Sequence, residues 1–401
     1  MLRYNSAQAP LSRVREQRLV STAASNRPRL VAIIGTRAQT IKMAPLLAEL
    51  ERRELPYRLL LTGQHHATID ALLDEFDIRT ARERLYDGPE IKGMLQAARW
   101  LLTTAWTLWH RRNDWAPCPR RETIVLAHGD TFTTLLAAGM GWLLGACVAH
   151  VEAGLRSFDW RHPFPEELTR RIVTRLAHIA YCPGQWACDN LAGHRLAIID
   201  TQANTILDAL RQALAQPARQ AAAIDTPYAV VSLHRFENLH SRERMTVILR
   251  TIRELARRLR VILVLHPTTE KRLTELGELD TLRDNPGIEL RPRMTYIPFM
   301  QLVSGARLVV SDGGSNQEEL SYLGIPTLLM RMATERQEGL DQNVTLSRFD
   351  PERITSTINC VTREPTNKQA NLPDTRPVEI ITDDLADCLS SSAVRYSERP
   401  R

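Results

Sequence analysis

Short apolar runs alternate along most of the chain with longer segments in which apolar residues recur at helical spacing. A strand, a crossover helix and a second strand together build a parallel sheet with helices on its faces, so this alternation constrains the fold strongly. The expected strands span residues 29–35, 57–63, 123–130, 147–154, 179–184, 228–234, 261–267, 308–314 and 326–331. The expected helices span residues 41–53, 133–144, 165–176, 241–259 and 317–322. The sequence therefore predicts an α/β fold with doubly wound parallel sheets.

The alternation stops near residue 200 and starts again at residue 228. Since 401 residues are many for a single core, this break predicts two domains. We expect a Rossmann-like N-terminal domain over residues 29–200 and a Rossmann-like C-terminal domain over residues 201–365. Residues 1–28 are expected to be a disordered basic extension, and residues 366–401 a tail that partly returns to the N-terminal domain or is mobile.

Charge and cysteine content exclude several classes of protein. The net charge of +6 is concentrated in residues 1–30, which hold six arginines and one acid, so no nucleic-acid partner is expected. The six cysteines form neither a C-x-x-C motif nor a zinc spacing, which favours reduced thiols in a cytoplasmic protein. No run of about 18 uncharged apolar residues occurs, so no membrane span is expected. The Trp-rich segment Met94–His110 is expected to be a core-facing amphipathic helix, although a helix lying on a membrane surface would show a similar pattern.

Polar or glycine-containing clusters stand at the carboxyl ends of seven of the expected strands. The clusters are Gly35–Arg37, Gly63–His65, His128–Asp130, Glu152–Gly154, His234–Arg235, His266–Pro267 and Asp312–Ser315. One such cluster is ordinary, because Asp, Ser or Thr often caps the next helix. Seven together predict a ligand-binding cleft, since ligands of open parallel sheets bind beyond the carboxyl ends of the strands.

Part of this cleft has the residues of an anion site. Arg37 and Lys42 flank a helix start, and the stretch DGGSNQEE (312–319) is a glycine-rich turn from strand to helix whose free N–H groups suit a phosphate. Glu319 could reach the hydroxyls of a ribose, and Arg336 adds a further cation. Neither G-x-G-x-x-G nor a P-loop motif occurs at a strand–helix turn, so dinucleotide and P-loop sites are not expected.

The expected acids of the cleft are Asp130, Glu152 and Glu166, all in the N-terminal domain. Each could also have an ordinary structural role: Asp130 as a helix cap, Glu152 in a buried pair with Arg156 or Arg170, and Glu166 as a first-turn residue of a helix. Three acids facing an anion-binding half indicate an enzyme that performs acid–base chemistry on a nucleotide sugar.

Seven motifs occur in the order found in one known family: GTRAQTIKMAP, GQH, HGDTFTT, HVEAGLR, FPEE, DGGSNQEE and MRMATERQEG. Over residues 29 to 360 the chain thus resembles the non-hydrolysing bacterial UDP-N-acetylglucosamine 2-epimerases. The resemblance implies a GT-B-like fold, with the active site between two Rossmann-like domains. It also implies interconversion of UDP-GlcNAc and UDP-ManNAc for cell-surface polysaccharides, without a metal or nicotinamide cofactor, in a homodimer.

The resemblance also assigns residues by position. Asp130, Glu152 and Glu166 would be the catalytic carboxylates. His234, counted with the catalytic group, and Arg336 would contact the diphosphate. The remaining substrate-binding positions are Arg37 and Lys42 near sugar and phosphate, Gly314, Ser315 and Glu319 at phosphate and ribose, Phe299 at uracil, and Gln64, His65, Arg156 and Arg170 on the sugar side.

The chain departs from the family pattern at four places. Ala38 and Gln39 replace a proline and an acid, the serine of the phosphate turn is shifted to Ser315, Ala203 replaces a hinge glycine, and the loop at residues 89–93 is not glycine-rich. Loss of the acid at Gln39 is shared with hydrolysing epimerases, which release UDP and free ManNAc. The sequence also leaves open an epimerase of a UDP-diacetamido-uronic acid, a GT-B glycosyltransferase and a non-catalytic UDP-sugar-binding protein.

Overall fold

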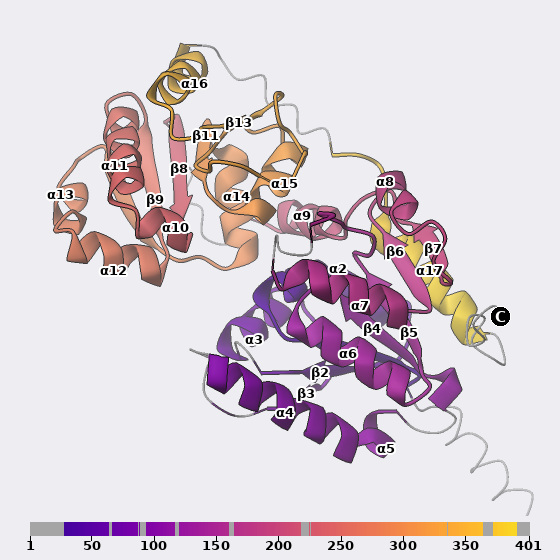
Figure 1. Cartoon of the computed structure of the whole chain (residues 1–401). Helices are drawn as coiled ribbons and strands as arrows, with labels where there is room; N and C mark the ends of the chain where they lie inside the picture. Colours follow the sequence, from indigo (N-terminus) through magenta and orange to yellow (C-terminus); the bar gives the residue numbers. More distant parts are fainter. Residues whose placement is uncertain are drawn as a thin grey trace, which may run out of the picture.

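The computed structural model describes residues 28–63, 66–86, 88, 94–116, 120–159, 164–217, 224, 226–334, 336–363 and 372–390. Within these ranges the strands form one sheet of seven and one of six, and every strand pair is parallel. Figure 1 shows the sheets lying in separate halves of the molecule, with helices on the faces of each. The predicted α/β fold with two doubly wound sheets is confirmed.

The first sheet, with its helices, is called the N-terminal unit. Its strand order is β3-β2-β1-β4-β5-β6-β7. The strands are β1 (Leu30–Ile34), β2 (Tyr57–Leu61), β3 (Arg82–Arg84), β4 (Ile124–His128), β5 (Cys147–Val151), β6 (Ile179–Cys182) and β7 (Ala197–Asp200). The helices are α2 (Arg37–Arg52), α3 (His66–Glu75), α4 (Met94–His110), α5 (Arg112–Trp115), the 3-10 turn η1 (Arg120–Glu122), α6 (Phe132–Leu143), α7 (Glu166–Leu176) and α8 (Gln185–Asp189).

The second sheet, with its helices, is called the C-terminal unit, and its order is β10-β9-β8-β11-β12-β13. The strands are β8 (Tyr228–Leu233), β9 (Arg260–Leu265), β10 (Ile288–Pro292), β11 (Leu308–Ser311), β12 (Thr327–Leu329) and β13 (Val344–Leu346). The helices are α10 (Phe236–Leu239), α11 (Arg242–Ala256), α12 (Pro267–Glu275), α13 (Leu279–Arg283), α14 (Tyr296–Gly305), α15 (Gly314–Tyr322) and α16 (Pro351–Arg363).

Strand β1 shows why the sheets are buried on both faces. Successive side chains of a strand point to opposite sides. Leu30, Ala32 and Ile34 pack in one apolar cluster with α2 and α3, whereas Val31 and Ile33 pack in another with α4 to α7. The first cluster continues through α9 (Ile206–Ala215) into α14 and the β8 face of the C-terminal unit, so the two units share a continuous apolar core.

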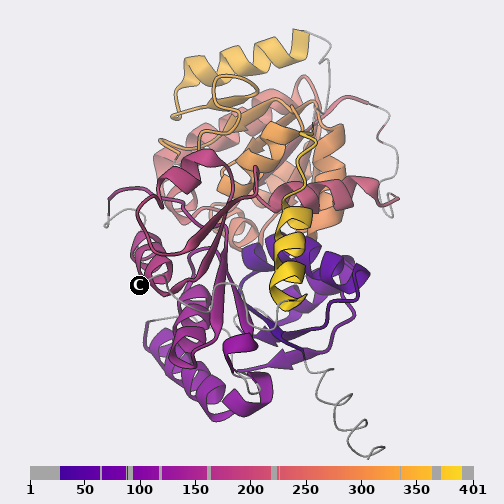
Figure 2. The ribbon, with the colours of Figure 1, turned by 90° about the vertical axis from the view of Figure 1, so that its right-hand side faces the viewer.

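The C-terminal helix α17 (Pro377–Ser390) packs against α2 and α9 (Figures 1 and 2). Asp208 of α9 accepts a hydrogen bond from the backbone N–H of Val378 at 3.0 Å. Further along the helix, the hydroxyl of Tyr181 in β6 donates to Asp384 at 2.8 Å. Helix α17 therefore contributes to the core of the N-terminal unit, although it follows the C-terminal unit in sequence.

Two helices that face the cleft begin earlier than the sequence pattern predicted. Helix α2 begins at Arg37 instead of residue 41, because Thr36 and Gln39 form a reciprocal capping box at its start. Helix α15 begins at Gly314 instead of residue 317. The early starts place Arg37 and Gly314 in first turns, where unpaired N–H groups face the cleft.

Segment Met94–His110 is helical as predicted, but it faces the core only in part. Trp100 and Leu108 are fully buried, whereas Trp106 is 62% exposed and Trp109 is 47% exposed. Among the described residues, no helix combines the length and the hydropathy needed to cross a bilayer.

Candidate functional site

Each sheet reverses its strand order at one point, and ligands of such sheets bind there, beyond the carboxyl ends of the strands. In the N-terminal unit the reversal lies between β1 and β4, which lead into Arg37 and Asp130. In the C-terminal unit it lies between β8 and β11, which lead into His234 and Gly314. The topology thus gives each unit a site of the same kind.

A cavity of about 560 Å³ lies where the units meet. Of the predicted site residues it is lined by Arg37, His234, Phe299, Gly314, Ser315 and Glu319. Arg37 comes from the N-terminal unit and the others come from the C-terminal unit. Residues from four separate stretches of the sequence are therefore brought to one cavity.

The floor of the cavity is the turn between β11 and α15. Asp312 is fully buried and accepts hydrogen bonds from the backbone N–H groups of His234 and Arg235, both at 3.0 Å, and from the side chain of Asn238. Its carboxylate therefore fixes the end of β8 against β11 and is not available to a ligand. The first N–H groups of α15, at Gly314 and Ser315, form the helix N-terminus at the cavity, a geometry that binds phosphate.

Four cationic or imidazole side chains line the same cavity: Arg37, His234, His266 and Arg293. The rings of His234 and His266 stack with centroids 4.6 Å apart. Burial, followed by the charges of neighbouring arginines, lowers the pKa of His234, and burial together with His234 lowers the pKa of His266 to about 3. Burial and the charge of Arg293 also lower the pKa of Arg37 to about 10. The positive charges of Arg37 and Arg293 therefore favour binding of an anion in the cavity.

Glu319 lies on the inner side of α15 and is almost fully buried. Burial, increased by the neighbouring charge of Glu318, raises the pKa of its carboxyl to about 8. Tyr296 of α14 lies beside it. A carboxyl in this state can donate or accept a hydrogen bond to a sugar hydroxyl inside the cavity.

Glu152 follows β5 with a positive φ of 63°, an uncommon backbone conformation for a side-chain-bearing residue that is typical of functional sites. Its buried carboxylate forms an ion pair with Lys42 of α2 and accepts a hydrogen bond from Asn204 at 2.7 Å. His128 lies 3.3 Å away and burial lowers its pKa to about 4. Burial alone would raise the pKa of Glu152, but Lys42, His128 and Arg336 hold it well below its usual range.

The other two predicted acids belong to the same unit: Asp130 follows β4, the neighbour of β5 in the sheet, and Glu166 is the first residue of α7. Asp130 accepts two hydrogen bonds from Arg170 of α7, at 2.9 and 2.6 Å. Glu166 begins α7, and one of its carboxylate oxygens is buried without a hydrogen-bond partner among the described residues. Arg156 lies 3.5 Å from Glu167, a fully buried acid that also contacts Arg170. Asp130 is therefore paired, whereas Glu166 keeps a free acceptor.

Arg336 joins the two halves of the site. Its guanidinium forms an ion pair with the buried Glu318 of α15, and its charge also acts on Glu152 in the N-terminal unit. Two other predicted site residues, Gln64 and His65, lie outside the described residues.

Three buried residues of the site were missed by sequence reasoning: Asn204, Glu318 and Glu167. Asn204 stands next to Ala203, the residue that replaces the hinge glycine, and its side-chain amide donates to Glu152. Glu318 and Glu167 each stand beside a predicted acid in the motifs QEE and PEE. The double glutamates were the available signal, because adjacent helix residues point in different directions.

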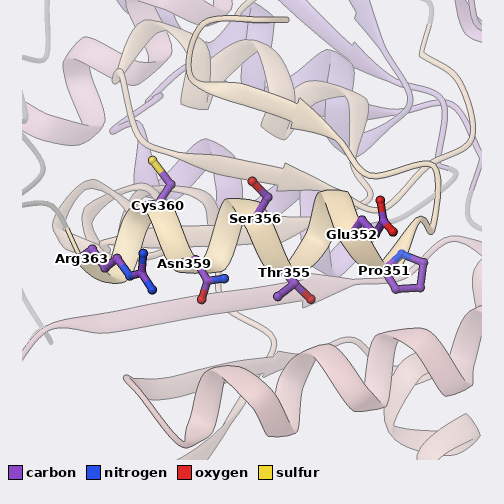
Figure 3. A pocket seen from close by; sticks show the side chains of 7 residues that line it. All are labelled: Pro351, Glu352, Thr355, Ser356, Asn359, Cys360 and Arg363. Carbon is purple, nitrogen blue, oxygen red and sulfur yellow. The ribbon is translucent and has the colours of Figure 1, made fainter.

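A larger hollow of about 710 Å³ lies along the outer side of α16 (Figure 3). All seven residues that line it come from this single helix, so no side chains from other elements converge on it. Its position and lining make it a poor candidate for catalysis. Within the described ranges, no three His, Cys, Asp or Glu side chains are grouped closely enough to hold a metal ion.

Known proteins resemble the chain over most of its length. The family model described as UDP-N-acetylglucosamine 2-epimerase matches residues 48–378. The UDP-N-acetylglucosamine 2-epimerase of Methanocaldococcus jannaschii is 31% identical over 327 residues, which cover 78% of this chain and 86% of that protein. The UDP-N-acetylglucosamine 2-epimerase of Bacillus subtilis is 29% identical over 334 residues, covering 81% of this chain and 85% of that protein.

Solved structures of the same family also resemble the chain over most of its length. The crystal structure of the M. jannaschii UDP-GlcNAc 2-epimerase in complex with UDP-GlcNAc and UDP matches with a TM-score of 0.73 and 28% identity, covering 89% of this chain and 99% of that one. The UDP-GlcNAc 2-epimerase of Neisseria meningitidis bound to UDP-GlcNAc matches with a TM-score of 0.71 and 26% identity, with the same coverage.

Proposed function

Because the chain belongs to the UDP-N-acetylglucosamine 2-epimerase family, we propose that it interconverts UDP-GlcNAc and UDP-ManNAc and keeps the UDP-sugar intact. The proposal rests chiefly on one observation: a buried, ionised Glu152 lies on the N-terminal side of a site whose C-terminal side is an anion-binding cavity. Relatives bind UDP-GlcNAc and UDP, which have the diphosphate that such a cavity would hold.

The chemistry explains why carboxylates and cations are both required. Carbon 2 of the sugar is not acidic while the glycosidic bond is intact. When the bond between C1 and the UDP oxygen breaks, its electron pair goes to the diphosphate and C1 becomes positively charged, which makes the proton on C2 acidic. A carboxylate then removes this proton, giving 2-acetamidoglucal and UDP. Return of a proton to the opposite face of C2 and re-addition of UDP to C1 complete the epimerisation.

The contacts of Asp130, Glu152 and Glu166 support a different role for Glu152 than for the other two acids. Glu152 has a pKa below its usual range, so it is a weak base but a permanent negative charge. We assign it to stabilising the positive charge that develops at C1. Glu166 has an oxygen without a hydrogen-bond partner among the described residues, and Asp130 is oriented by Arg170. We assign the proton transfers at C2 to these two residues.

Proton and phosphorus NMR with UDP-GlcNAc in D₂O tests this function. The expected result is UDP-ManNAc with deuterium at C2, and Glu166→Gln should stop the incorporation. UDP together with free ManNAc would instead identify a hydrolysing enzyme. Binding without any reaction would point to a related UDP-sugar, such as a diacetamido-uronic acid, or to a binding protein.

We also propose a homodimer. The N-terminal unit carries exposed apolar side chains at Leu102, Trp106 and Trp109 of α4, one face of that helix, and at Trp142 and Leu143 near the end of α6. A second copy of the chain would bury them. Light scattering after size-exclusion chromatography should give twice the 45.5 kDa of the chain, and Trp106→Glu should give the monomer.

We also propose that the enzyme is cytoplasmic and that its product is used for a cell-surface polysaccharide. A cytoplasmic enzyme is supported by the cysteines, since none of the five in the described ranges forms a disulfide. The product UDP-ManNAc would then supply the synthesis of a cell-surface polysaccharide. Loss of ManNAc from the surface polymer after deletion of this chain's coding sequence would support that role.

A further inference from the structure

Arg293 follows β10 and lines the cavity of about 560 Å³, although no sequence motif singled it out. Arg37, from the opposite unit, lines the same cavity. The guanidinium of Arg37 reaches the backbone carbonyl of Met294 at 3.5 Å, one residue beyond Arg293. The two arginines therefore come from different units but line the same side of the cavity.

Neither guanidinium is neutralised by an ion pair. Among the described residues, no acid lies within ion-pair distance of Arg37 or Arg293. Of the nearest acids, Glu75 is engaged by the first backbone N–H groups of α14, and burial raises the pKa of Glu319 to about 8, which favours its neutral form. Two like charges at one wall without a counterion repel each other, and a bound anion would relieve that repulsion.

The remaining contacts of the cavity define the anion. The N-terminus of α15 supplies N–H groups at Gly314 and Ser315, and the stacked His234 and His266 lie beside them. A single carboxylate would use one arginine. A diphosphate has two phosphoryl groups, so it can use two arginines and a helix N-terminus at once.

We propose that Arg293 is a further diphosphate-binding residue, which clamps the UDP leaving group together with Arg37 of the opposite unit. This inference rests on the proposed function and extends it. When the C1–O bond breaks, the additional negative charge appears on the terminal phosphoryl group of UDP, where an arginine stabilises it. Since the two arginines come from different units, the diphosphate also holds the units together.

Titration calorimetry with UDP and with uridine tests the clamp. Arg293→Met should weaken UDP binding by about 10- to 100-fold, the usual effect of losing a charge-assisted hydrogen bond, and leave uridine binding unchanged. Arg291→Met is the matched control, because Arg291 lies two residues earlier and bonds to Glu289 at 2.6 Å outside the cavity. Arg293 is exposed, so its variant should melt like the wild type.

Each contrary result has a distinct meaning. Wild-type affinity for UDP in Arg293→Met would overturn the clamp while leaving the proposed function intact. Equal losses for UDP and uridine would overturn it as well, because Arg293 would then act on the nucleoside. Failure of the wild-type protein to bind UDP would overturn the proposed function and the clamp together.

Discussion

Glu75 of the N-terminal unit caps a helix of the C-terminal unit at Tyr296. Its carboxylate accepts hydrogen bonds from the backbone N–H groups of Tyr296 and Ile297, at 3.1 and 3.0 Å, and from the hydroxyl of Thr295 at 2.7 Å. The neighbouring Phe76 stacks on Tyr296 with ring centroids 5.9 Å apart. Helix α14 carries part of the cavity wall, so the N-terminal unit fixes the position of that wall.

Replacing Glu75 should therefore affect binding more than chemistry. Glu75→Gln places an amide N–H against the N–H groups of α14, and loss of such a cap costs about 1 kcal/mol, or about fivefold in affinity. We expect KM for the UDP-sugar to rise by about this factor while kcat changes little. Asp74→Asn is the control, since Asp74 is on the same helix but bonds to Arg82 at the surface. Unchanged KM with a lower Tm would show that the cap serves stability alone.

The ion pair of Lys42 with Glu152 gives a prediction that separates stability from catalysis. Glu152→Gln should abolish turnover and keep UDP binding, because most of the anion-binding cavity belongs to the other unit. It should also destabilise the protein by about 3–5 kcal/mol, since Lys42 is left buried without its partner.

The double variant Lys42→Met with Glu152→Gln removes both charges. It should regain much of the lost stability in denaturant unfolding but none of the turnover, which would separate the catalytic role from the structural one. Turnover in either variant would refute the assignment of Glu152. Because the pKa of Glu152 is lowered in the folded protein, the stability that it contributes in the wild type should be present above about pH 4.5 and lost as pH falls further.

The central strands could be predicted from sequence, whereas the edge strands could not. Strands such as β1, β4 and β8 are buried along their whole length and therefore read as continuous apolar runs. The strands β3, β7, β10 and β13, which are the edge strands of the two sheets, were missed; β3 reads Arg-Glu-Arg and is partly exposed. At a sheet edge, backbone pairing forms a strand without the apolar pattern on which the prediction depends.

Six of the predicted site residues line the cavity, because the ends of apolar strands can be recognised in a sequence, whereas the partners of a side chain cannot. Gln39 illustrates the limit. Its replacement of an acid pointed towards a hydrolysing enzyme, yet its side chain is buried away from the cavity. The amide accepts from the backbone N–H of Gly35 at 3.1 Å and donates to the carbonyl of His128 at 2.8 Å, so it ties β1 to β4.

Gln39→Ala should accordingly destabilise the protein without changing the products. The variant leaves the buried backbone N–H of Gly35 without its side-chain acceptor, at a cost of about 1–3 kcal/mol, and removes one of the two side-chain donors to the carbonyl of His128, so Tm should fall by several degrees. Phosphorus NMR should show the same ratio of UDP-ManNAc to free UDP as in the wild type. Thr134→Val, which removes a hydroxyl that bonds to the same carbonyl, is the control for a purely structural effect. A shift towards free UDP in Gln39→Ala alone would give Gln39 a part in retaining the glycal.

Glu319 should make stability fall as pH rises, and Glu319→Gln should remove this contribution to the pH dependence. Its pKa in the folded protein is about 8, above the ordinary value of 4.5, because it is buried next to Glu318. The folded state therefore binds this proton more tightly than the unfolded state, and the resulting stability is fully present below pH 4.5 and lost as pH rises to about 8. The Tm of Glu319→Gln minus that of the wild type should thus increase between about pH 5 and pH 9, by at least about 2 °C. The exposed Glu352→Gln should give a constant difference, and a constant difference for Glu319→Gln would mean that its carboxyl is already ionised at neutral pH.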